Sequence, residues 1–145
     1  MNDATKIKAA LCGALLAVNA WLGALAVPLY IMMGASVLDY LTGLAAAPAR
    51  AEKLSSYKGI RGIVKKVCMW TLVAVGAMVD LLLGYVGLTL PAGASMATVV
   101  AVWIAANELL SILENAADIG IPLPKNLVRL VAQIKETVEG EEDGD

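Results

Sequence analysis

Residues 92–125, AGASMATVVAVWIAANELLSILENAADIGIPLPK, decide the fold, because an uncharged apolar run passes into a polar one without a break. The apolar part, residues 92–106, carries no charge, and the polar part begins at once with Asn107 and Glu108. About 20 apolar residues in a helix cross the hydrocarbon core of a bilayer. A helix over residues 94–117 would therefore span a membrane and carry carboxylates and amides towards one end.

The whole chain has the composition of a membrane protein. Of its 145 residues, 59% are hydrophobic and 17% are charged, and the mean hydropathy is +0.74. Charged residues are absent between Lys8 and Asp39, between Lys66 and Asp80, and from there to Glu108. Such gaps are long enough for membrane-spanning helices, so we expect an all-α integral membrane protein.

The first apolar segment, residues 9–47, is too long for one helix across a core about 30 Å thick. Two spans, about residues 8–22 and 24–47, fit if the chain turns at Trp21-Leu22-Gly23. Pro28 would then lie near the start of the second helix, where proline is tolerated. The alternative is a single tilted helix kinked at Pro28, which gives three spans in the chain instead of four.

A cleaved signal peptide competes for residues 1–26, because Lys6 and Lys8 precede an apolar run. More apolar sequence follows it rather than a soluble domain, which favours retention of the segment. Cys12 and Cys68 lie in or beside apolar runs, and we expect both to be unpaired thiols. With no histidine and two isolated cysteines, neither a transition-metal site nor another cofactor is expected.

The linker between the second and third apolar segments is basic. The positive-inside rule places this linker in the cytoplasm, and it places Lys6 and Lys8 there too. The chain must then cross the membrane an even number of times between Lys8 and the linker, which favours a hairpin. A third span over residues 64–84 and the fourth over 94–117 form a second hairpin, which puts both termini in the cytoplasm. Topology alone explains the basic residues, although they could also attract anionic lipid; nucleic-acid binding is not expected. They are Arg50, Lys53, Lys58, Arg61, Lys65 and Lys66.

The end of the chain differs from the apolar part, residues 1–124, which we expect to form the transmembrane domain. Apolar residues recur at helical spacing over residues 125–138, with charged residues on the other side. This pattern predicts an amphipathic helix lying on the inner membrane face. Residues 139–145, EGEEDGD, are expected to form a disordered acidic tail.

The fourth predicted helix has one face that is small towards its start and polar towards its end. Small residues let helices approach closely in lipid, and we expect this face to be a self-association surface. A buried Glu108 costs about 3 kcal/mol in a membrane helix, so it needs a partner, water or a proton. It lies either hydrated at the inner interface or at helix contacts in an assembly. The face comprises Gly93, Ala97, Ala101, Ala105, Glu108, Ser111, Asn115 and Asp118.

Further polar residues lie in the second and third spans. Asp39 and Thr42 are one helical turn apart near the inner end of the second span, and a contact with Lys65 or Lys66 would satisfy Asp39. Asp80 lies towards the outer end of the third span, where capping or snorkelling is the simplest role. Together with Asn107 and Glu114, these residues complete the candidates for assembly or pore lining. No arrangement of side chains resembles a catalytic site, so we expect a non-enzyme.

Four segments carry a family resemblance: LDYLTG at 38–43, KLSSYKGIRGIVKK at 53–66, MVDLLLG at 78–84 and NELLSILENAADIGIPLPK at 107–125. In this order and spacing they resemble bacteriophage holins of the toxin secretion/phage lysis holin family, over about residues 24–130. The apolar segment before LDYLTG is rich in alanine and lacks the polar turn that relatives often have there.

The resemblance implies a protein that accumulates in the cytoplasmic membrane of a bacterial host, forms homo-oligomers and opens lesions through which an endolysin reaches the cell wall. Related members are linked to the export of large toxins, and an antiholin partner is left open. A small ion channel or transporter using Asp39, Asp80 and Glu108 is the rival hypothesis, and a structural membrane subunit without a pore is a third. The motif positions transfer only as structural or assembly determinants: Asp39, Thr42, Gly43, Leu54, Ser55, Ser56, Gly59, Gly62, Asn107, Glu108, Glu114, Asn115, Gly120, Pro122 and Pro124.

Overall fold

The computed structural model describes residues 2–51, 55–90 and 95–139, and the regular structure in this part of the chain is entirely helical. The prediction of an all-helical protein is therefore confirmed. The predicted positions Lys53, Leu54 and Gly93, and residues 140–145 of the predicted acidic tail, lie outside the described residues. The elements are α1 (Asp3–Leu22), a 3-10 turn η1 (Gly23–Leu25), α2 (Ala26–Ala46), α3 (Ser56–Tyr85), α4 (Met96–Asp118) and α5 (Lys125–Glu139).

Three helical stretches in the described part are long and apolar enough to cross a membrane, rather than the four expected. They are Asp3–Ala46, Gly59–Tyr85 and Met96–Asp118. The first of these contains both α1 and α2, which η1 joins almost without interruption.

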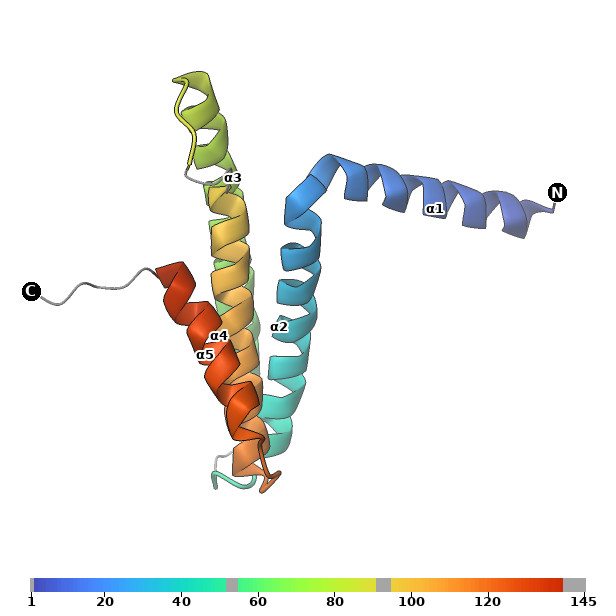
Figure 1. The fold of residues 1–145 in the computed structure, drawn as a ribbon. Helices are drawn as coiled ribbons and strands as arrows, with labels where there is room; N and C mark the ends of the chain where they lie inside the picture. Colours follow the sequence, from blue (N-terminus) through green and yellow to red (C-terminus); the bar gives the residue numbers. More distant parts are fainter. Residues whose placement is uncertain (1, 52–54, 91–94, 140–145) are drawn as a thin grey trace, which may run out of the picture.

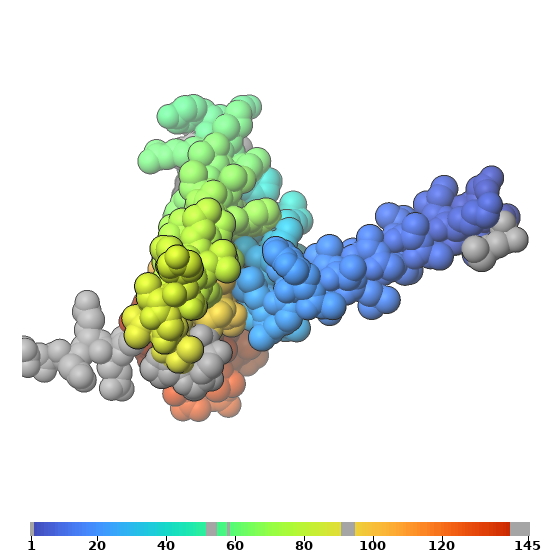
Figure 2. Space-filling model, turned by 90° about the horizontal axis from the view of Figure 1, so that it is seen from above, coloured from blue at the N-terminus to red at the C-terminus, as the bar shows by residue number. Residues whose placement is uncertain are grey.

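The predicted hairpin between the first two helices is not formed. The chain does bend where expected, because Gly23 adopts a φ of 55°, which glycine reaches without steric cost. However, η1 leads directly into α2, so the chain changes direction once and does not reverse. Figure 1 shows α1 extending away from the other helices, and Figure 2 shows it from above as a separate arm. Residues 2–21 are all exposed, so α1 has no packing partner within its own chain.

Helices α2, α3 and α4 form the body of the molecule (Figure 1). Both α2 and α3 pack against α4, but they make few contacts with each other. Pro28 lies in the first turn of α2, as expected, where its missing N–H costs no hydrogen bond. The apolar core fills the half of the bundle nearest η1 and the start of α4, and consists of Met32, Val73, Ala97, Ala101, Ile104 and Ala105.

The outer surface of the bundle is also apolar. Large hydrophobic side chains are exposed on both α2 and α3; Leu41 is 55% exposed and Leu81 75%. A water-soluble domain rarely presents such a surface without a partner, whereas a bilayer solvates it. The distribution of apolar side chains is therefore that of a membrane bundle.

The motif glycine and prolines after α4 fix the direction of α5. Gly120 adopts a φ of 92°, its N–H donates to Ala117 O at 2.9 Å, and Ile121 N–H donates to Ala116 O at 3.0 Å. This pattern closes a helix C-terminus. After Pro124 the chain starts α5, which runs back alongside α4 (Figure 1) and packs against it.

Candidate functional site

Polar side chains from α2, α3 and α4 meet inside the bundle, in the half that faces the basic linker. We call this group the polar cluster. The three helices bring it together from positions that are far apart in the sequence, and the described residues leave no buried polar side-chain atom without a hydrogen-bond partner. The polar cluster consists of Ser36, Asp39, Thr42, Lys66, Trp70, Glu108 and Asn115.

Lys66 is the centre of the polar cluster. Its ammonium donates to Asp39 Oδ2 at 2.7 Å and also to Glu108 Oε2, so one cation serves two carboxylates. The side chains of Lys66, Asp39 and Glu108 are only 16%, 15% and 5% exposed. The expected contact between Asp39 and the linker is present and is made by Lys66, whereas Lys65 is exposed.

The second oxygen of Glu108 is also satisfied. Ser36 Oγ donates to Glu108 Oε1 at 3.0 Å, and Trp70 Nε1 donates to Ser36 Oγ at 3.2 Å. Of the two placements considered for Glu108, the structure has it at helix contacts rather than hydrated, since the residue is 4% exposed. These contacts lie within one chain.

Asn115 extends the polar cluster towards the linker. Its Nδ2 donates to Asp39 Oδ1 at 2.9 Å and to Thr42 Oγ1 at 3.0 Å, while Arg50 donates to its carbonyl oxygen. Arg50 also pairs with Asp118 at the end of α4. The motif positions Asp39, Thr42 and Asn115 thus join α2 to α4 and tie the start of the linker to both.

The self-association surface predicted on α4 faces the interior of the chain. Ala97, Ala101 and Ala105 are buried in the apolar core, and Glu108 and Asn115 are buried in the polar cluster. The small residues do allow a close helix approach, but the partners are α2 and α3 of the same chain. The periodicity correctly grouped these residues on one face, but it could not identify which helix covers that face.

Two other candidates on α4, Asn107 and Glu114, lie outside the polar cluster. Asn107 Nδ2 donates to Trp103 O of its own helix at 3.0 Å. Glu114 is exposed, whereas Ser111 is partly buried and its side chain hydrogen-bonds Asp39 on α2. Of the candidate positions on α4, Glu108, Ser111 and Asn115 therefore make polar contacts with other helices.

Asp80 lies near the opposite end of the bundle and caps α4. Its two carboxylate oxygens accept from Met96 N–H at 2.6 Å and from Ala97 N–H at 2.9 Å, and Ser95 Oγ accepts from Thr98 N–H at 3.1 Å. The first N–H groups of a helix have no partner within it, and a carboxylate there also interacts favourably with the helix dipole. Capping is thus the correct one of the two roles expected for Asp80.

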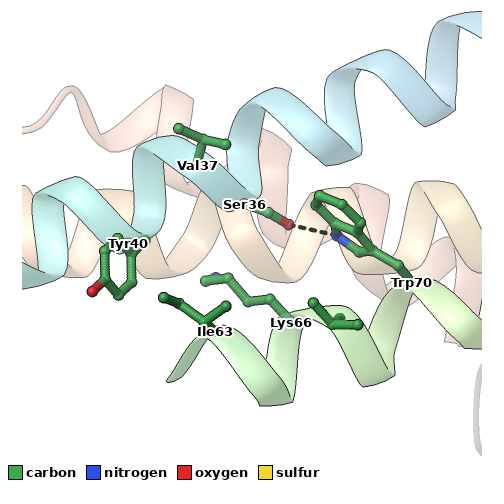
Figure 3. Close-up of a pocket in the computed structure, with 7 residues that line it drawn as sticks. Ser36, Val37, Tyr40, Ile63, Lys66 and Trp70 are labelled. Carbon is green, nitrogen blue, oxygen red and sulfur yellow. Dashed lines mark hydrogen bonds between the residues drawn. The ribbon is translucent and has the colours of Figure 1, made fainter. Parts of the chain in front are cut away.

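A groove of about 160 Å³ lies between α2 and α3, and Lys66 is one of the residues that line it. Figure 3 shows Lys66 between Tyr40 and Trp70, with Val37 on one side and Ile63 on the other. Tyr40 lies close to the motif glycine Gly59 on α3, where an added Cβ would lie 3.2 Å from Tyr40 Oη. At Gly62 an added Cβ would meet the same ring at 4.0 Å, an ordinary van der Waals distance.

Three contributing residues, Ser36, Tyr40 and Trp70, were missed by the sequence reasoning. A signal for Ser36 was available, because it lies one helical turn before Asp39 and so shares its face. Trp70 carried no such signal, since an indole in a span is usually apolar filling or an interface anchor. In the described part of the chain, no group of acidic or cysteine side chains is arranged to hold a metal ion.

Comparison with known proteins gives a consistent result. A profile of the bacteriophage holin family matches residues 16–136. An uncharacterized protein of Halalkalibacterium halodurans is 39% identical over 107 residues, which cover 74% of this chain and 77% of that protein. An uncharacterized protein of Listeria monocytogenes is 38% identical over 74% of this chain and 70% of its own length.

A third relative, an uncharacterized protein of Clostridium perfringens, is 35% identical over 77% of this chain and 80% of its own length. No solved structure matches this chain significantly.

Proposed function

Because the chain belongs to the bacteriophage holin family, we propose that it acts as a phage holin: it accumulates in the cytoplasmic membrane of a bacterial host, self-associates and opens lesions. An endolysin would pass through these lesions to the cell wall and lyse the host. A holin-like role in toxin export is the related alternative. Holins in general have no enzymatic activity, and we propose none for this chain.

The pairing of Lys66 with Asp39 and Glu108 carries this proposal. An unpaired charge in a membrane helix costs about 3 kcal/mol or more, so a protomer with unpaired charges would need a second chain to supply counter-charges. Here Lys66 pairs with Asp39 and Glu108 of the same chain. The large side chains exposed on α2 and α3 are apolar. The buried charges of the three spans therefore need no second copy as a partner, which suits a protein that acts only after reaching a threshold amount.

The basic linker supports a definite orientation. Under the positive-inside rule the ends of α2 and α4 near Arg50 and Asp118 lie at the cytoplasmic side, and the end near Asp80 lies outside. The turn at Gly120, which leads from α4 into α5, then lies on the cytoplasmic side. A cytoplasmic N-terminus remains a prediction, and it requires α1 to turn further about Gly23 until it crosses the membrane beside the bundle.

Self-association needs apolar surface that the protomer leaves uncovered. Helix α1 has 20 residues and buries none of them in its own chain. In a membrane it is therefore surrounded by lipid or by another copy. Association of α1 with neighbouring copies would build large assemblies without breaking the polar cluster, and we propose this as the first step towards a lesion.

The rival ion channel is less well supported. Its path would join Asp39 and Glu108 to Asp80, but Met32, Val73 and Ile104 of the apolar core lie between these groups. Asp80 is already engaged by the start of α4, and Lys66 neutralises the other two carboxylates. A selective path within one protomer would have to displace all of these contacts.

Inducible expression in bacteria, with an endolysin supplied or withheld, tests the proposal. We expect sudden growth arrest in both cultures and lysis only in the culture that contains the endolysin. Continued growth at high membrane levels of the protein, or crosslinking that yields only monomers at those levels, would contradict it. A small fixed oligomer with selective conductance would favour the channel instead.

A matched pair of variants tests the role of the polar cluster in timing. Glu108→Gln removes one of the two carboxylates on Lys66 but leaves Asp39 as its partner, so the chain should still insert. We expect the onset of lysis or the size of the assembly to change. Glu114→Gln makes the same chemical change at an exposed position of α4 and should leave both unchanged. Identical lysis curves for the two variants would mean that Glu108 and the polar cluster do not influence when lesions form.

A further inference from the structure

Burial of the polar face of α4 raises the question of which surface meets water in a lesion. Glu108 and Asn115 are 4% and 3% exposed, and both are held by α2, so they cannot line an opening while the bundle is intact. In the described part of the chain, α5 presents a further polar surface alongside the bundle. It was expected to lie on the inner membrane face, but in the structure α5 packs along α4 (Figure 1).

The depth of α5 follows from one contact at its end. Trp103 Nε1 on α4 donates to Glu139 Oε1 at 2.7 Å. Trp103 lies 15 residues before Asp118, which is about 22 Å along an α-helix. Since α4 has 23 residues, about 34 Å in all, α5 covers roughly two-thirds of its length. A bilayer core is about 30 Å thick, so most of α5 lies at the depth of the span.

The two faces of α5 differ in character. Val131, which is 7% exposed, packs towards α4, and Val128 and Val138 on the same side are partly buried. The opposite side is polar and exposed, with Leu127, Leu130 and Ile134 as an apolar strip at one edge. We call the polar side the outer face of α5; it comprises Asn126, Arg129, Gln133, Glu136 and Thr137.

We propose that α5 stays docked on α4 in the assembled state and that its outer face lines the water-filled interior of the lesion. This inference rests on the proposed function. A charged helix face cannot lie against hydrocarbon at this depth, because Arg and acidic groups there are strongly disfavoured. Water in an interior enclosed by several copies would solvate it. The lining of the lesion is therefore α5 rather than the small and polar face of α4.

The experiment uses the full chain, with Cys12→Ser and Cys68→Ser, assembled in phospholipid vesicles. One spin label is placed at Gln133→Cys on the outer face, and the control label at Leu82→Cys, an apolar α3 position that is 66% exposed. Collision with a water-soluble nickel chelate and with oxygen distinguishes water from lipid. We expect the Gln133 label to respond to the chelate and the Leu82 label to oxygen, and Arg129→Cys provides a second outer-face position.

Docking is measured in the same assemblies with a nitroxide at Glu136→Cys, which keeps Glu139, and with Trp103 as the remaining tryptophan after Trp21→Phe and Trp70→Phe. We expect loss of most of the Trp103 emission, because residue 136 lies one helical turn from Glu139, which contacts Trp103. Unchanged emission would mean that α5 has left α4, and oxygen-dominated relaxation at Gln133 would mean that its outer face meets lipid. Either result overturns the inference.

The same single-cysteine variants, without the label, are also expressed in cells. Whether they lyse the cells distinguishes a failure of this inference from a failure of the proposed function. Endolysin-dependent lysis with an undocked α5 would overturn the inference alone. A docked, water-exposed α5 in a protein that never releases endolysin would support the lining but overturn the holin proposal.

Discussion

Gly76 on α3 lies so close to Ala97 on α4 that a Cβ built on Gly76 would come within 2.9 Å of both the Cα and the backbone nitrogen of Ala97. Real side chains do not approach a backbone this closely. The two helices can therefore pack at this distance only because residue 76 is glycine and residue 97 is small. This contact lies beside the start of α4, where Asp80 caps the helix.

Gly76→Ala should destabilise the folded bundle even though alanine is the better helix former. Alanine favours a helix over glycine by about 1 kcal/mol, whereas overpacking a tight contact typically costs about 1–3 kcal/mol. We expect a lower midpoint in thermal or denaturant unfolding in detergent. Gly84→Ala on the same helix is the control, because nothing lies within 4 Å of its added Cβ, and it should be neutral or stabilising. Equal shifts for the two variants would argue against the close approach.

Lys66→Met should be among the most damaging single substitutions in the bundle. It leaves Asp39 and Glu108 buried without their shared cation, and breaking a buried ion pair typically costs about 3–5 kcal/mol. Lys65→Met removes a charge at the neighbouring exposed position and should change stability little. Unfolding midpoints of both variants, measured in the same detergent, test this. A Lys66 variant as stable as the Lys65 variant would mean that the two carboxylates are not held by Lys66.

Neutralising all three charged groups should recover much of that loss. The triple variant Asp39→Asn, Lys66→Met, Glu108→Gln has no buried charge left to compensate, and such replacements are often neutral or stabilising. Ser36 and Asn115 can still donate hydrogen bonds to the introduced carbonyl oxygens. We expect an unfolding midpoint well above that of Lys66→Met alone. A midpoint as low as that of the single variant would show that packing of the lysine stem, rather than charge, governs its contribution.

The sequence predicted individual contacts better than the arrangement of helices. Asp39 was expected to meet Lys65 or Lys66, and Asp80 to act as a cap, because a charge in an apolar segment must find a partner nearby. The bend at Gly23 was predicted for a related reason, since glycine accepts backbone angles that other residues avoid. Each of these inferences concerns a local physical requirement.

Two expectations, the hairpin of the first two helices and the self-association surface on α4, differ from the structure for another reason. Helical periodicity shows that Ala101 and Glu108 share a face, but it does not show which helix covers them. In lipid an apolar helix can face another helix or the bilayer with similar ease, so the sequence of α1 does not require a partner. Ser36 and Trp70 were missed because their pairing depends on the relative height of α2 and α3, which periodicity within one helix does not determine.

Asp80→Ala should loosen the start of α4 without abolishing the fold. The substitution removes the acceptor of two backbone N–H groups, at Met96 and Ala97, and loss of a helix cap typically costs about 0.5–2 kcal/mol. The expected signature is local: amide hydrogen exchange should accelerate at these two residues, while the exchange of Glu108 and its neighbours stays slow. Glu114→Ala removes an exposed acid on α4, the helix that Asp80 caps, and as the control it should leave both regions unchanged. Unaltered exchange at Met96 and Ala97 would mean that Ser95 alone caps α4, and Asp80 would then return to the set of residues free to act in assembly.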